Sequence, residues 1–94
     1  MNKAEAMILI EEELSVFRSK SYLELKEMIE AEPITKEIAS ELHTKYQIEI
    51  IAHWDDKPDG DIRIGGCIDD MGWRAYFPLS SDFIMSPEGE FIDE

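Results

Sequence analysis

The stretch YQIEIIAHW, residues 46–54, alternates between two kinds of side chain. One set of alternate positions is large or apolar and comprises Tyr46, Ile48, Ile50, Ala52 and Trp54. The positions between them are polar, with Ile51 as the apolar exception. Because successive side chains of a strand point to opposite faces of a sheet, this alternation predicts a strand with one buried face and one half-solvated face.

A turn and a second strand are expected after residue 54. The turn contains Pro58, which presets φ, and Gly60, which is expected to supply a positive φ. The alternation resumes from Ile62 to Ile68, so the two strands are expected to form an antiparallel hairpin. The pair Gly65-Gly66 inside the second strand indicates a bulge or a close backbone approach, for example beneath a helix or beside Trp54.

Two helices are expected before the strands. In residues 4–18 the apolar side chains recur every three or four positions, which places them on one helix face. They are Met7, Ile10, Leu14 and Phe17. Ser21 followed by Glu24 has the spacing of a capping box, so a second helix is expected to begin at Tyr22. Pro33 ends it, because the residue before a proline is pushed out of the helical region.

Residues 34–43 fit two interpretations. Ile34, Ile38 and Leu42 follow a helical spacing, whereas Ile34, Lys36, Ile38 and Ser40 fit an edge strand. The pattern alone does not decide between them over so few residues.

The rest of the chain predicts further β structure. We expect a turn at residues 69–72, a strand over 73–77 that Pro78 ends, and an irregular or one-turn helical segment at residues 80–82. Residues 83–92 predict a small hairpin around Pro87 and Gly89. Helices followed by strands indicate an α+β fold, with two N-terminal helices packed on one face of an antiparallel sheet of about four strands. The chain is expected to form a single domain over residues 1–94.

The composition is strongly acidic, with 22 Asp and Glu residues against 9 Lys and Arg residues and a formal net charge of −13. Nucleic-acid binding relies on basic side chains that neutralise phosphates, so this charge argues against a nucleic-acid partner and against anionic membrane surfaces. The same charge would attract a basic protein partner or cations, and the simpler interpretation is that it maintains solubility and keeps the monomers dispersed. The single cysteine, Cys67, excludes an intramolecular disulfide, and no signal-peptide pattern is present, so we expect a cytoplasmic location.

Candidate binding residues are concentrated between residues 68 and 77. Asp69 and Asp70 precede Trp73 and Arg74, and Glu49 is expected on the same sheet. An arginine among aromatic residues can stack on a ring and pair with a turn aspartate. One interpretation is that this pair only fixes the turn. The other is that the residues form an aromatic and acidic recognition surface or a pocket.

The sequence patterns that would indicate a metal site or a catalytic nucleophile are incomplete. The acidic turn that starts at Asp55 has some features of a calcium loop, but Lys57 and Gly66 stand where ligands are needed. One cysteine and two distant histidines do not supply a zinc site. Cys67 could act only with His43 or His53, and a symmetric hairpin places His53 near residue 64 instead. We therefore expect no metal, no cofactor and no catalytic residue.

Several short strings resemble a family of small bacterial proteins that has no assigned activity. The strings are YQIE (46–49), HWD (53–55), GDIR (60–63), IDDMGWRA (68–75), PL (78–79), FI (83–84), SPEG (86–89) and Phe91. The most specific is IDDMGWRA. The resemblance implies a cytoplasmic bacterial protein with a helix followed by an antiparallel sheet, and on that basis we expect a strand over residues 34–40. It supplies no catalytic residues.

Three functions from different classes are compatible with these features. The first is a non-enzymatic acidic interaction domain, for example of the inhibitor or immunity type, that binds a basic protein partner. The second is a small-ligand-binding protein or enzyme that uses Asp69, Asp70, Trp73 and Arg74, which requires a concave pocket with convergent polar groups. The third is a homodimer through a sheet edge, which requires an uncapped edge strand.

Overall fold

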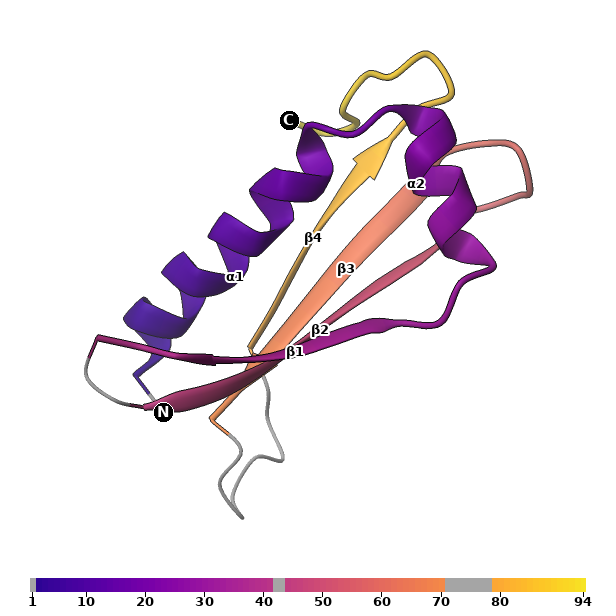
Figure 1. Ribbon diagram of the computed structural model, residues 1–94. Coiled ribbons are helices and arrows are strands. Elements are labelled where there is room, and N and C mark those ends of the chain that lie inside the picture. The colour runs from indigo at the N-terminus through magenta and orange to yellow at the C-terminus, as the bar shows by residue number, and fades with distance from the viewer. Residues whose placement is uncertain (1, 42–43, 71–78) are drawn as a thin grey trace.

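Two helices precede a four-stranded antiparallel sheet (Figure 1). The computed structural model describes residues 2–41, 44–70 and 79–94. The helices are α1 (Lys3–Arg18) and α2 (Tyr22–Ile29), and the strands are β1 (Ile34–Ala39), β2 (Lys45–Trp54), β3 (Ile62–Asp69) and β4 (Leu79–Met85). Both helices contact the sheet, which confirms the α+β class.

The strands lie in the order β1-β2-β3-β4, so each strand pairs with its neighbours in the sequence. β2 and β3 form the expected hairpin, in which His53 lies opposite Arg63 and Cys67 lies opposite Glu49. His53 and Cys67 therefore do not face each other, as the hairpin geometry predicted. The strand expected over residues 34–40 is present as β1, so the helical alternative for this segment is wrong.

The core lies between the helices and the sheet. In β2 and β3 the side chains that point into the core are those of the even-numbered residues, as the alternation predicted. Only this face of the two strands meets the helices. The fully buried large side chains are Ile10, Leu14, Leu25, Tyr46, Ile48, Ile50, Ile62, Ile64 and Ile68.

Helix α1 packs across β3 and β4. It begins after Asn2, whose side chain accepts a hydrogen bond from the amide of Glu5 at 3.0 Å. Its buried stripe includes Ala6, whereas Met7, which we expected on this face, is 37% exposed. A Cβ atom on Gly66 would lie 2.8 Å from Cδ1 of Ile10, so this glycine provides the close approach beneath a helix that the sequence indicated.

Helix α2 packs across the other end of β2 and β3. The predicted capping box is present: the Ser21 hydroxyl accepts from the Glu24 amide at 3.2 Å, and the Glu24 carboxylate accepts from the Ser21 amide at 3.1 Å. Leu25 is fully buried beneath the helix. The Tyr22 hydroxyl donates to the carbonyl oxygen of Gly60 at 2.7 Å, which ties the helix to the β2–β3 turn.

In the β2–β3 turn, the positive φ lies at Asp59, at 65°, and not at Gly60 as expected. Aspartate is among the few non-glycine residues that adopt this conformation readily. The Asp59 carboxylate is also held by Lys26 of α2, with 2.6 Å between Nζ and Oδ1.

Strand β4 contains Ser80, Ser81 and Asp82, so our expectation of an irregular or helical segment there is wrong. Ser81 lies opposite Gly66 and donates a hydrogen bond to a carboxylate oxygen of Glu11 in α1. Asp82 points to the other face and binds Arg63. Ser81 and Asp82 therefore form hydrogen bonds on opposite faces of the sheet. These bonds outweigh the weak preference of serine and aspartate for strands. The predicted strand over 73–77 and most of the turn before it lie outside the described residues.

After β4 the chain folds back over a turn, as predicted. The returning segment makes a single bridge, between Met85 and Phe91, and Gly89 supplies a positive φ of 82° in the turn. The guanidinium of Arg18 lies over the rings of Phe83 and Phe91, at 4.7 and 5.2 Å from their centroids. These contacts fix the end of α1 against β4 and the turn.

Candidate functional site

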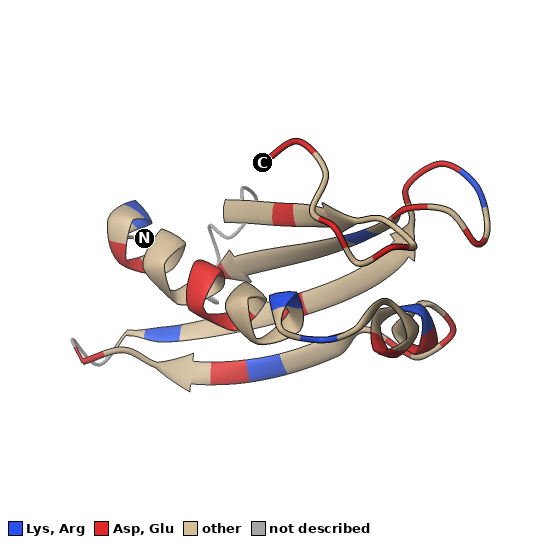
Figure 2. Ribbon diagram, turned by 90° about the horizontal axis from the view of Figure 1, so that it is seen from above, with Lys and Arg blue, Asp and Glu red and all other residues tan. Residues whose placement is uncertain are grey.

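One face of the sheet is covered by neither α1 nor α2. Figure 2 shows α1 and α2 on the same side of the strands. We call the other side the open face, and it is formed by the odd-numbered residues of β1, β2 and β3 and the even-numbered residues of β4. All of these residues are exposed or half-buried, so the open face is available to a partner.

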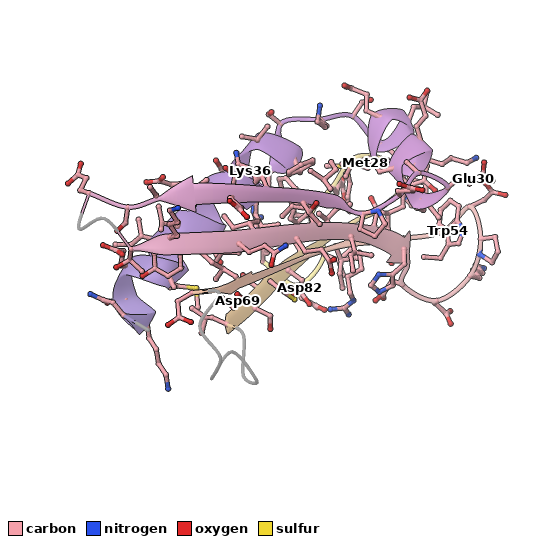
Figure 3. All side chains as sticks on the ribbon, turned by 60° about the horizontal axis from the view of Figure 1, so that its bottom comes forward. Met28, Glu30, Lys36, Trp54, Asp69 and Asp82 are labelled. Carbon is pink, nitrogen blue, oxygen red and sulfur yellow. The ribbon has the colours of Figure 1, made fainter. Side chains whose placement is uncertain are left out.

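One end of the open face is acidic. The strand register places Glu37, Gln47 and Asp69 in one row across β1, β2 and β3, and it places Glu49 opposite Cys67 in the next row. We call Glu37, Glu49 and Asp69 the acidic end. Gln47, Glu49, Cys67 and Asp69 line a hollow of about 230 Å³ there. In Figure 3, which looks onto the sheet from the side away from α1, Asp69 lies at the end of the sheet farther from α2.

The other end of the open face is organised by Arg63. Its Nε donates to Asp55 Oδ1 at 2.8 Å, and its Nη1 donates to Asp82 Oδ2 at 2.6 Å. These hydrogen bonds raise the pKa of Arg63 above its ordinary value, and the bond to Asp82 contributes more than the bond to Asp55. The positive charge of Arg63 is thus already shared by two carboxylates.

Cys67 lies half-buried between Glu49 and Ser80 in the register. Burial raises the pKa of its thiol, and the negative charges of Glu49 and Asp69 raise it further. A nucleophilic cysteine needs the opposite environment, because nearby positive charge is what stabilises a thiolate. The surroundings of Cys67 therefore oppose covalent catalysis by this residue.

The structure brings together only part of the predicted site. Glu49 and Asp69 lie on adjacent strands of the open face, on the walls of the same hollow. Asp70 follows the end of β3, and its negative charge is the smallest of the causes that raise the pKa of Tyr46, which is buried on the helix side. Trp73 and Arg74 lie outside the described residues, so the proposed pairing of Arg74 with a turn aspartate stays a prediction.

Three members of the open face were missed from the sequence. Glu37, Arg63 and Asp82 come from three strands, and alternation shows which face each residue occupies but not which strands are neighbours. The hairpin between β2 and β3 was predicted, so its register could have placed Arg63 beside His53. No comparable signal pointed to Glu37 or Asp82.

No group of three His, Cys, Asp or Glu side chains in residues 2–41, 44–70 and 79–94 is arranged to hold a metal ion. Neither of the described helices is both long enough and apolar enough to cross a membrane.

Comparison with known proteins gives no match: none of the protein-family models fits this chain, and neither the curated proteins nor the solved structures contain a significant relative. The resemblance of IDDMGWRA and the other short strings to a bacterial family therefore stays a prediction.

Proposed function

We propose that this protein is a non-enzymatic interaction domain that binds a basic protein partner through the acidic end of its open face. The observation that supports this function is the set of carboxylates from three adjacent strands on a sheet face that neither α1 nor α2 covers. An inhibitor or immunity-type role, in which the domain neutralises a basic partner, is the specific form of the proposal.

The charge balance supports a basic partner. Among the described residues, five Lys and Arg side chains already lie in ion pairs with carboxylates of this chain, at Arg18, Lys20, Lys26, Lys36 and Arg63. The acids outnumber the bases by 22 to 9, so these internal pairs leave a large surplus of negative charge. Such a surplus attracts a positively charged protein and accelerates its association at low ionic strength.

The hollow at the acidic end suits a side chain of a partner better than a small ligand. Its volume of about 230 Å³ is below the roughly 300–1,000 Å³ of typical ligand pockets. The carboxylates of Glu49 and Asp69 on its walls are the groups that accept charge-assisted hydrogen bonds from lysine and arginine. A basic side chain that reaches between β2 and β3 would therefore be matched in size and in charge.

The test is an NMR titration of the isotope-labelled protein with a short peptide of lysine and arginine. We expect the largest amide shifts at Glu37, Gln47, Glu49 and Asp69, and an affinity that falls as salt screens the charges. Shifts of equal size over the whole acidic surface would show attraction without a site and would contradict the proposal.

A matched pair of double variants separates the site from the net charge. Glu37→Gln/Glu49→Gln removes two charges from the open face, and Glu12→Gln/Glu90→Gln removes two exposed charges elsewhere. We expect the first variant to bind the peptide about three- to tenfold more weakly, because exposed pairs contribute modestly each, and the second to bind nearly as the wild type does. If both variants bound the peptide equally weakly, the binding site would not lie on the open face.

A further inference from the structure

β1 is an edge strand whose outer side meets no other strand in the part of the chain that the structure describes (Figure 2). Five of its six residues are exposed, and only Ile38 is half-buried. The third hypothesis from the sequence, a homodimer through a sheet edge, requires an edge of this kind. The exposed edge could pair with a strand of a second copy of this chain or with a strand of another protein.

The backbone groups that point outward from β1 follow from the register. The Ser40 amide donates to the Thr44 carbonyl at 2.8 Å, so residues 40 and 44 form a hydrogen-bonded pair. Hydrogen-bonded pairs recur every second residue in an antiparallel ladder. The even-numbered residues of β1 therefore bond to β2, and the amide and carbonyl groups of Thr35, Glu37 and Ala39 point away from it.

The side chains along this edge differ on the two sides of the sheet. On the helix side, Ile34 is 41% exposed and Ile38 is half-buried, because α1 packs on β3 and β4 and leaves β1 without a helix. A groove of about 510 Å³ lies between α1 and the end of β1, and its apolar lining includes Ile8 and Leu9. On the open side, β1 contributes Thr35 and the carboxylate of Glu37.

The charges around β1 are mainly negative. Glu32, Glu37 and Glu41 are exposed along or beside the strand. Lys36, the one lysine in β1, is bound by Glu13 of α1 at 2.6 Å. The labelled Lys36 lies in the middle of the strand in Figure 3.

A second copy of this chain fits the edge poorly. In a symmetric antiparallel pair of β1 strands, one residue lies opposite its own copy. With the strands centred on each other, that residue is Lys36 or Glu37, and like charges directly opposite each other are destabilising. Each chain also brings a net charge of −13 to the contact.

We propose that β1 accepts an extended segment of the basic partner as a fifth, antiparallel or parallel strand. Outward groups of Thr35, Glu37 and Ala39 supply the backbone hydrogen bonds of such β-augmentation. The segment alternates, with basic side chains on the open side beside Glu37 and apolar side chains on the helix side beside Ile34 and Ile38. This inference rests on the proposed function, since it assigns part of the contact with the same partner.

The experiment compares two synthetic peptides of alternating valine and lysine on the wild-type protein. The second peptide carries N-methyl groups on alternate amides, which leaves its charge and side chains unchanged but prevents strand pairing along one edge. We expect the unmethylated peptide to bind about tenfold more tightly or better, from two or three additional hydrogen bonds. We also expect hydrogen exchange at the amides of Thr35, Glu37 and Ala39 to slow when it binds.

A proline variant in β1 tests whether the peptide binds along this strand. Thr35→Pro removes one outward amide without a change of charge, and proline is tolerated where the amide faces solvent on an edge strand. Unchanged hydrogen exchange at the amides of Lys36 and Ile38 would show that β1 of the variant still pairs with β2. We expect this variant to lose several-fold in affinity for the unmethylated peptide and little for the methylated one.

The outcomes separate the two proposals. Equal binding of both peptides would overturn strand addition while leaving the basic partner in place. Binding of the lysine and arginine peptide with no binding of either alternating peptide would do the same. A doubled mass by light scattering without peptide, with slowed exchange at Thr35 and Glu37, would assign the edge to a second copy of the chain and would also overturn the inference.

Discussion

Gly66 lies where α1 comes closest to the sheet, and its neighbour Gly65 lies on the open face. A Cβ atom at Gly66 would meet Cδ1 of Ile10 at 2.8 Å and Cδ1 of Ile50 at 3.1 Å, whereas one at Gly65 would meet nothing within 4 Å. We expect Gly66→Ala to lower the free energy of unfolding by about 1–3 kcal/mol through overpacking. Gly65→Ala should be neutral or stabilising by up to about 1 kcal/mol, because alanine restricts the unfolded chain.

Urea unfolding of the two glycine variants measures this difference directly. The two substitutions add the same methyl group to adjacent residues of one strand, so any effect on strand preference is shared. A Gly66→Ala protein as stable as Gly65→Ala would show that α1 moves away from β3 without cost.

Tyr46 is fully buried, and its hydroxyl donates to the Glu5 carboxylate at 2.7 Å. Burial, and then this hydrogen bond, raises the pKa of Tyr46 from 10.0 to about 12. A raised pKa in the folded state favours the neutral phenol, so this stabilisation is complete below pH 10 and is lost as the pH rises toward about 12. We expect Tyr46→Phe to be less stable at neutral pH by about 1 kcal/mol and to lose less stability between these pH values.

The check on Tyr46 combines urea unfolding across this pH range with tyrosinate absorbance. In the wild-type protein Tyr46 should ionise late, and that step should be missing from Tyr46→Phe. Burial also raises the pKa of Tyr22, so the difference between the two titration curves is what identifies Tyr46. An unchanged titration curve would assign the late step to another tyrosine.

Single residues were predictable from the sequence where one local rule decides them. Gly66 carried a signal because a glycine inside a strand marks a close approach. The positive φ at Asp59 was missed, because glycine is the usual choice and the bond from Lys26 that holds Asp59 comes from a distant helix. Asp69 and Asp70 looked equivalent in the sequence, and only the strand geometry separates their surroundings.

At the scale of elements, α2 has eight residues and depends on its capping box. We expect Ser21→Ala to lower the free energy of unfolding by about 1 kcal/mol, because the amide of Glu24 loses its partner. Ser15→Ala is the matched control: Ser15 is exposed within α1, and its hydroxyl bonds only to the Glu12 carbonyl at 2.6 Å. That change should be neutral or slightly stabilising, since alanine is the better helix former.

Thermal unfolding followed by circular dichroism would compare the two serine variants. Equal stabilities would mean that the contacts of Tyr22, Leu25 and Lys26 with the rest of the fold hold α2 without the cap, which would then be dispensable.

The elements were predictable to the extent that their own residues determine them. The capping box located α2, and alternation located β2 and β3. The end of β4 was predicted as part of the hairpin over residues 83–92, but its first half was not, because two serines and an aspartate resemble a loop until Glu11 and Arg63 are brought beside them from other elements. For β1 the pattern allowed a helix or a strand, and its pairing with β2 decides between them.

At the scale of the whole molecule, the net charge of −13 should make stability depend on salt. The Debye length falls from about 30 Å at 0.01 M to about 8 Å at 0.15 M ionic strength, so salt screens repulsion across the molecule. The ion pairs that salt also weakens are exposed and contribute little each. We therefore expect Tm to rise by several degrees over this range.

Scanning calorimetry at the two ionic strengths would show this rise in Tm. A variant with Glu12, Glu27 and Glu90 replaced by glutamine should depend less on salt than the wild type. A fall in Tm on addition of salt would mean that the attractive pairs outweigh the repulsion.

The fold class followed from the sequence, because helices followed by strands leave few arrangements. The candidate site did not follow to the same degree. Glu49 and Asp69 were placed on one sheet and both helices on one face of it, but the width of the acidic end depends on β1 lying next to β2 and on the register between these two strands. These are properties of the assembled layers, and no local pattern contains them.

Helix α1 is synthesised first, yet it packs on β4, the last of the six elements to be made. Roughly 60 residues separate the end of α1 from the start of β4, so at about 5–20 residues per second their translation takes roughly 3–12 s. β3, the other strand that α1 contacts, is made earlier, but until β4 follows, the nascent chain presents an amphipathic helix whose docking surface is incomplete. The speed of translation and the chaperones near the ribosome therefore influence how safely this chain reaches its fold, independently of the stability of the finished protein.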